Sequence, residues 1–431
     1  MSVAFREHPL RRTVAAELHA RVFQPLRAPI QLSHIAVICD EQDRDRDLGH
    51  LRRLLAHYGD SIPQHLDQHY AADLGSVRLR WERHTEFVTY TFSRQGAFAH
   101  PFADPVLNQV PAEWLRELPG EVIAAVLMAI EACDMPERDI RALTALFDGN
   151  PVIGSAVVAG AARAWSDLRI HPDGYSRILV RDCSMSENQA GRLAKRLLDI
   201  NCYRALALLG LPPAREVFPT LSDAERRLAQ VASRMTTQGA SSDPDFESDL
   251  LAELTGLAAE IEEAAARTTY RFDASRAYYG IVRQRLEQLR QHRIEGLQTF
   301  SEFLDSRLAP AIATCEATQR RQSDLAERAA RLTSLLRARV EVSLQEQNRR
   351  LLESMDRRAR LQLRLQETVE GLSVIAIGYY GVGLIGYALK GLEKSGLAID
   401  ATLGMAIALP FVVGITWFAL RRIKKRVMGS A

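Results

Sequence analysis

Two uncharged apolar segments near the C-terminus constrain this chain more than any other feature of its sequence. Residues 372–389 read LSVIAIGYYGVGLIGYAL and residues 401–420 read ATLGMAIALPFVVGITWFAL, without one charged side chain. As α-helices, which rise 1.5 Å per residue, they would be roughly 27 and 30 Å long and would match the hydrocarbon core of a bilayer. The sequence therefore predicts a transmembrane hairpin over 371–420. The alternative is a pair of buried helices in a soluble fold.

Basic residues flank this hairpin asymmetrically. The segment between the two spans, residues 390–400, contains only two lysines. Nine basic residues lie just outside the hairpin: Arg357, Arg358, Arg360, Arg364, Arg421, Arg422, Lys424, Lys425 and Arg426. Because basic flanks stay on the cytoplasmic side, we expect both termini in the cytoplasm and residues 421–431 to form a basic tail. The preference for arginine over lysine is typical of a GC-rich bacterial genome, so the expected location is the bacterial inner membrane.

Small and aromatic residues are concentrated in the first span. Glycine lets membrane helices approach closely, and Pro410 could kink the second span. The candidates for helix packing or for lining a pore are Gly378, Tyr380, Gly381, Gly383, Gly386 and Tyr387.

A long helical stalk is predicted over residues 216–370. Ser222 to Glu225 has the pattern of a capping box, which predicts that a helix begins there. A polar linker is expected near 235–246, followed by a helix after Pro244, and another is expected from Val282 through Leu304 to a break at Pro310.

The last predicted helix of the stalk is the longest. Its apolar side chains recur at intervals of three, four and seven residues, as in a coiled coil. They are Leu325, Ala329, Leu332, Leu336, Val340, Leu344, Leu351 and Met355. No helix breaker separates this stripe from the first span, so one helix is expected from about Gln319 to Leu389. Such a stripe favours homo-oligomerisation through the stalk and first span; a monomeric bundle is the alternative.

Residues 1–215 mix strand and helix patterns, which predicts an α+β cytoplasmic domain with an antiparallel or mixed sheet. Strands are expected over 32–38, 77–92, 152–170 and 175–180, the last two joined by a turn at His171–Gly174. Ser186 to Gln189 is a capping box that predicts the start of a helix ending near Gly210.

One alternating segment of this domain could carry chemistry. On a strand over 77–92, the side chains of Glu82, His84 and Glu86 would share one face, and two carboxylates with an imidazole could bind a divalent cation. A polar network or an exposed sheet face are the alternatives. The polar segment 8–21 could pair with segment 81–87 as an acid and base, but charged surface turns and helix caps are the favoured explanation.

Composition excludes several function classes. The 55 basic and 53 acidic side chains give a net charge of +2, which argues against a nucleic-acid partner. Five dispersed cysteines suit a reducing compartment, and the first residues lack the apolar core of a secretory signal. No phosphate-binding, dinucleotide, hydrolase or zinc-protease motif occurs, so neither a cofactor nor an enzymatic activity is expected.

The whole chain resembles a bacterial family of uncharacterised membrane-anchored proteins, a domain of unknown function. The resemblance implies a membrane location and no established activity. The segments that carry it are 8–11, 17–21, 81–87, 203–212 and 361–373.

The architecture also resembles that of the CorA-type magnesium channels, which implies a homo-oligomer whose first spans line a pore. The Gly-Met-Asn signature of those channels is absent; the local candidates are Tyr380–Val382 and Gly386–Ala388, whereas Gly404–Ala406 lies in the wrong helix. Three functions remain open: CorA-like ion transport, a membrane-tethered scaffold that binds protein partners without transport, and, least favoured, a membrane-tethered enzyme that uses His84 with Glu82 or Glu86.

Overall fold

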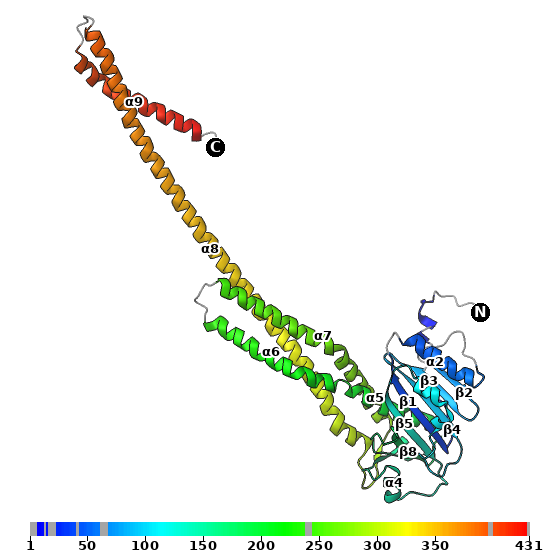
Figure 1. Cartoon of the computed structure of the whole chain (residues 1–431). Helices are drawn as coiled ribbons and strands as arrows, with labels where there is room; N and C mark the ends of the chain where they lie inside the picture. The colour runs from blue at the N-terminus through cyan, green and yellow to red at the C-terminus, as the bar shows by residue number, and fades with distance from the viewer. Residues whose placement is uncertain are drawn as a thin grey trace. The chain divides into compact units, whose positions relative to one another are not determined.

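The computed structural model describes residues 7–12, 14–15, 23–39, 43–60, 68–237, 244–394 and 400–428. It divides the chain into two compact units. The first unit contains residues 1–238 and 252–333, and the second contains residues 239–251 and 334–431. Helical residues 252–333 therefore belong to the same unit as the N-terminal sheet (Figure 1).

A mixed sheet organises the first unit. Within the described residues it has nine strands in the order β2-β3-β4-β1-β5-β8-β7-β6-β9. All neighbouring strands are antiparallel except β5 and β8, which are parallel. The strands are β1 (Ile30–Ile38), β2 (His69–Asp73), β3 (Arg78–Arg83), β4 (Phe87–Gln95), β5 (Glu121–Glu131), β6 (Ile153–Val157), β7 (Ala162–Ser166), β8 (Ser176–Asp182) and β9 (His292–Arg293). The predicted α+β domain with a mixed sheet is confirmed.

Helices cover both faces of this sheet. Helix α5 (Glu187–Leu208) packs on one face, together with the end of α7 (Pro244–Gln288) and the start of α8 (Phe300–Lys394). The other face carries α2 (Arg44–His57), the 3-10 helix η1 (Val106–Gln109), α3 (Ala112–Arg116) and α4 (Ile140–Leu146). A short 3-10 turn, η2 (Val158–Gly160), joins β6 to β7.

Local signals explain where several elements begin. The Ser186 hydroxyl accepts from the Gln189 amide and the Gln189 side chain accepts from the Ser186 amide, so the predicted capping box starts α5. The turn at His171–Gly174 also forms, with Gly174 at φ +86°.

Two predicted strands prove to be hairpins. Segment 77–92 turns back at residues 84–86 and forms β3 and β4, because the His84 amide bonds the Phe87 carbonyl. Segment 152–170 likewise splits into β6 and β7, which pair with each other. An alternating pattern continues through such a turn, so periodicity alone did not reveal it.

The helix boundaries of the predicted stalk also differ. Helix α6 (Leu211–Thr237) begins eleven residues before Ser222, whose hydroxyl donates to the Phe218 carbonyl inside the helix. The buried stripe runs straight across the expected boundary, through Val217, Leu221, Ala224 and Leu228, and tertiary packing overrides the capping pattern. Residues 238–243, within the expected linker, lie outside the described residues.

The helix expected over 282–304 is interrupted. Helix α7 ends at Gln288, a loop containing β9 follows, and α8 starts at Phe300. The loop is marked by positive φ at Arg290 and Gly296. Pro310 does not end a helix, since it lies within α8, which runs unbroken to Lys394 and so extends the predicted helix 319–389 in both directions.

Candidate functional site

The β3–β4 turn sends the three candidate metal ligands into different contacts. Glu82 lies in β3, whereas His84 and Glu86 belong to the turn. His84 stacks on Phe87 with 4.1 Å between ring centroids. In the part of the chain that the structure describes, no three His, Cys, Asp or Glu side chains are placed to hold a metal ion.

Glu82 sits between two cations beneath helix α5. Its Oε1 accepts from Arg80 Nη2 at 2.6 Å and its Oε2 accepts from Lys195 Nζ at 2.8 Å. Burial alone would raise the pKa of Glu82, but the charges and hydrogen bonds of Lys195 and Arg80 outweigh it and lower the pKa to about 2. Lys195 also lies 3.7 Å from Asp199, which accepts from Arg285 at 2.8 Å. These contacts form a chain of alternating charges, which runs through Arg80, Glu82, Lys195, Asp199 and Arg285.

A cavity of about 50 Å³ lies between the sheet and α5, next to this charge chain. One part of its wall is polar and includes His34, Arg80, Thr91 and Ser93. The apolar part of the wall comprises Leu26, Leu32, Ala194 and Leu198, and Gln24, Glu82, Gly191, Lys195 and Asp199 complete the lining. Its volume is enough for about three to five water molecules.

His34 on β1 lines this cavity and has one buried ring nitrogen without a described partner. Its Nδ1 lies 2.8 Å from Thr91 Oγ1, while its Nε2 is buried without a hydrogen-bond partner among the described residues. Burial lowers the pKa of His34 to about 4, with the charges of Lys195 and Arg80 adding to the effect against that of Glu82. The imidazole is therefore neutral at neutral pH and can give one hydrogen bond to a molecule in the cavity.

The segment before β1 closes one side of the cavity. Gln24 crosses α5 at Gly191, where a Cβ atom would lie 1.9 Å from the Gln24 carbonyl oxygen. The Leu26 amide then bonds the Glu187 carbonyl. Only glycine allows this approach, so Gly191 positions Gln24 and Leu26 against the helix that carries Lys195.

Glu86 occupies a separate cluster on α7. It receives hydrogen bonds from both terminal nitrogens of Arg271, at 3.1 and 3.0 Å, and from the hydroxyls of Tyr270 and Tyr278. Burial raises the pKa of Tyr278, and the hydrogen bond to Glu86 raises it further. With four donors around one carboxylate, this cluster fastens α7 to the sheet and leaves no free valence for a metal.

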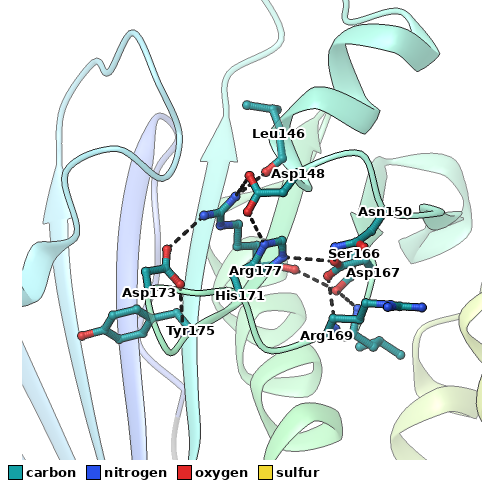
Figure 2. Close-up of polar contacts among 11 residues, drawn as sticks. Leu146, Asp148, Asn150, Ser166, Asp167, Arg169, His171, Asp173, Tyr175 and Arg177 are labelled. Carbon is teal, nitrogen blue, oxygen red and sulfur yellow. Dashed lines mark hydrogen bonds and ion pairs between the residues drawn. The ribbon is translucent and has the colours of Figure 1, made fainter.

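A second buried histidine lies on the opposite face of the sheet (Figure 2). His171 Nδ1 lies 2.8 Å from Asp148 Oδ2, and its Nε2 lies 3.0 Å from Asp167 Oδ2 without the alignment of a hydrogen bond. Arg177 donates to Asp148 and Asp173, and Asp148 and Leu168 both have positive φ. The hydrogen bonds from His171 and Arg177 lower the pKa of Asp148. These contacts tie three loops together, while His171 Nε2 and Arg177 Nε stay buried without a hydrogen-bond partner among the described residues.

The structure describes only part of the polar segment 8–21. Arg11 and Arg12 pair with Glu7 on the surface, whereas residues 16–22 lie outside the described residues. The acid–base pair expected between segments 8–21 and 81–87 therefore stays a prediction.

Both predicted spans form helices that are long and apolar enough to cross a membrane. Helix α9 (Ala401–Met428) packs on the end of α8 through glycines. A Cβ at Gly381 would lie 2.8 Å from Val412 Cγ1, and one at Gly404 would lie 2.8 Å from Leu389 Cδ1. Gly386 approaches Met405 just as closely, Gly378 leaves room for an ordinary contact with Val413 at 3.6 Å, and Gly383 has nothing within 4 Å of its Cβ position. Tyr380 and Tyr387 are exposed.

The model of the family described as "Protein of unknown function (DUF3422)" matches residues 6–427. The chain belongs to this family. Its match includes both units, so the cavity and the two spans are parts of one family domain. No curated protein matches the sequence. Among solved structures, "structure of the full-length CmaX protein" is similar at 13% identity over 70% of this chain and 89% of that chain, with a TM-score of 0.18.

Sequence reasoning found only one member of the cavity wall, Glu82. Lys195 and Asp199 are four residues apart on α5 and so share one helix face, but no local pattern connects that face with strand β3. His34 lies within an apolar strand, and a lone histidine in a buried strand was the signal that could have drawn attention to it.

Proposed function

We propose that this member of the family is anchored in the bacterial inner membrane by its C-terminal hairpin and holds its first unit in the cytoplasm. One observation carries this proposal: the apolar side chains of both spans are uncovered. Only 11% of the most apolar stretch of α8 is buried, and none of the most apolar stretch of α9 is buried. Leaving so much apolar surface in water is unfavourable, and a bilayer is the solvent that removes the cost.

The proposed orientation follows from charge. Arg357, Arg358, Arg360 and Arg364 precede the first span, and a further group of basic residues follows the second, so the positive-inside rule places both helix ends in the cytoplasm. Tagging each terminus and the 390–400 loop for protease or thiol access in spheroplasts tests this. Labelling of the termini from outside would overturn the orientation.

We also propose that copies of the chain associate through α8. Between Val340 and the first span this helix carries exposed apolar side chains along its length. Leu344, Leu351, Leu365 and Leu372 recur at multiples of seven residues, the spacing at which two helices can share a seam. A second copy brings the same stripe and is the partner that this symmetry fits best.

Two experiments test anchoring and association separately. Carbonate extraction of membranes should leave the full chain in the pellet, and a chain ending at residue 370 should appear in the supernatant. Recovery of the full chain in the supernatant would refute anchoring. For association, the mass of the detergent-solubilised chain should fall to that of a monomer in Leu351→Asp with Leu365→Asp. Gln345→Asp adds charge beside the seam and should leave the mass unchanged; a monomeric parent chain would refute association.

Ion transport like that of the CorA-type channels is the second candidate, because α8 enters the first span without a break. Tyr380 and Tyr387 are exposed, and Gly383 has nothing within 4 Å of its Cβ position, so all three are available to line a pore between copies. Liposomes loaded with a divalent-sensitive dye test this candidate. Flux no greater than that of empty liposomes would leave the membrane-tethered scaffold, with its unidentified protein partners, as the function.

A further inference from the structure

The cavity beneath α5 contains more free hydrogen-bond donors than free acceptors. Both oxygens of Glu82 already accept from cations, and both oxygens of Asp199 face Lys195 or Arg285. On the donor side, Arg80 uses only Nη2 among the described residues, toward Glu82, and keeps its other N–H groups. A molecule that completes this wall must therefore bring acceptors.

Two further side chains point to the same chemistry. The Ser93 hydroxyl lines the cavity and makes no hydrogen bond to the described residues. His34 Nε2 is buried and unpartnered, and a buried nitrogen without a partner costs free energy that a bound acceptor would recover. When the Thr91 hydroxyl donates to Nδ1, the neutral ring presents its proton on Nε2. With this tautomer, the cavity lining supplies a guanidinium, a hydroxyl and an imidazole N–H to one small acceptor group.

The rest of the wall limits the size and polarity of the occupant. Leu26, Leu32 and Leu198 present hydrocarbon opposite the polar side. A volume of about 50 Å³ holds the equivalent of about three to five water molecules. A fully hydrated inorganic anion would leave this hydrocarbon uncovered, whereas a short alkyl chain would cover it.

We propose that this cavity binds a short-chain carboxylic acid, with its carboxylate at Arg80, Ser93 and His34 and its alkyl group against the leucines. Arg80 supplies the charge, because guanidinium N–H groups match the geometry of a carboxylate. The cavity and the proposed membrane anchor lie in different units, so binding at the cavity can be tested separately from anchoring.

Saturation-transfer NMR on the detergent-solubilised full chain tests the proposal, with propionate as the probe. Propionate should bind, and propionamide should bind at least about tenfold more weakly because it lacks the charge. Absence of propionate binding would overturn the proposal. Binding of phosphate but not of propionate would overturn the assignment to a carboxylic acid.

Two variants with matched controls locate the site. Arg80→Lys keeps a cation beside Glu82 but loses the planar donor pair, and it should weaken propionate binding about tenfold. Arg78→Lys, on the same strand but paired with Asp73 outside the cavity, should not. Ala194→Val fills the cavity from α5, and Ala205→Val adds the same carbons elsewhere on that helix. Equal binding by Arg80→Lys and Ala194→Val, in chains that melt like the parent, would place propionate elsewhere and refute the site.

Discussion

Lys195 on helix α5 donates a 2.8 Å hydrogen bond to Glu82 on strand β3, across 113 residues of sequence. Glu82 is largely buried and also pairs with Arg80, so its charge is compensated from both sides. This pair joins the helix to the sheet beside the cavity. The buried charge of Glu82 requires both partners, because an uncompensated charge in that position would be strongly unfavourable.

Replacing Lys195 by Met should therefore lower the free energy of unfolding by about 3 kcal/mol, since it removes one partner of a buried ion pair. Denaturation in urea, followed by tryptophan fluorescence, measures the change. The exposed pair of Arg349 with Glu353 supplies the control: Arg349→Met should change the stability by less than about 1 kcal/mol. Equal effects of the two substitutions would contradict the role assigned to Lys195.

Stability should fall as the pH drops below about 6.5. The pKa of His34 is about 4 in the folded chain and 6.5 when unfolded, so between these values the unfolded chain binds the additional proton and gains free energy from it. The expected loss from His34 is about 2 kcal/mol between pH 7.5 and pH 5. Burial and the charge of Arg53 lower the pKa of His50 to about 4 as well, so His50 adds to the same decline.

Urea midpoints at pH 7.5 and pH 5 measure this dependence, and His34→Gln should remove about half of it, since His50 keeps its own contribution. Glu82 does not confound the measurement, because its pKa of about 2 means that its contribution is lost only below its unfolded value of 4.5. A His34→Gln chain with the same pH dependence as the parent would show that the ring is not buried in its neutral form.

A fragment ending at residue 215 should not fold stably, although the sequence indicates a domain boundary there. The core on the α5 face includes Val282, Leu286, Phe300 and Leu304, which such a fragment lacks. Strand β6 would also lose its pairing with β9. A fragment of residues 1–333 keeps both and should show cooperative thermal unfolding by circular dichroism, whereas 1–215 should bind a hydrophobic dye. Cooperative unfolding of 1–215 would contradict this dependence.

A larger side chain where the two spans touch should destabilise the hairpin. In Gly381→Ile the new side chain meets Val412, a stiff neighbour, so we expect a loss of about 1–3 kcal/mol. Gly383→Ile adds the same atoms where nothing lies within 4 Å and serves as the control. The melting temperatures of the two variants in detergent measure the difference. A larger decrease in Gly383→Ile than in Gly381→Ile would show that α9 packs on the Gly383 face of α8.

Sequence patterns predicted elements with strong local causes and missed those decided by distant contacts. The capping box at Ser186 and the two apolar spans depend on neighbouring residues, and all three formed. The capping pattern at Ser222 was overruled by the buried stripe of α6, and the β3–β4 turn was hidden inside a continuous alternation. For the site, Glu82 was found because it lies in a conspicuous polar segment. His34 is signalled by being a lone histidine in a buried strand, but no local rule connects it or Lys195 with Glu82, since the three residues lie on separate elements.

The core of the first unit is completed late in synthesis of the chain. Ile312, the last residue of the α5-face cluster, precedes the first apolar span by sixty residues. At a synthesis rate of about 5–20 residues per second, the ribosome covers that distance in roughly 3 to 12 s. The sheet therefore acquires its final cover only moments before the insertion machinery must receive the hairpin, and a delay in folding would coincide with delivery to the bilayer.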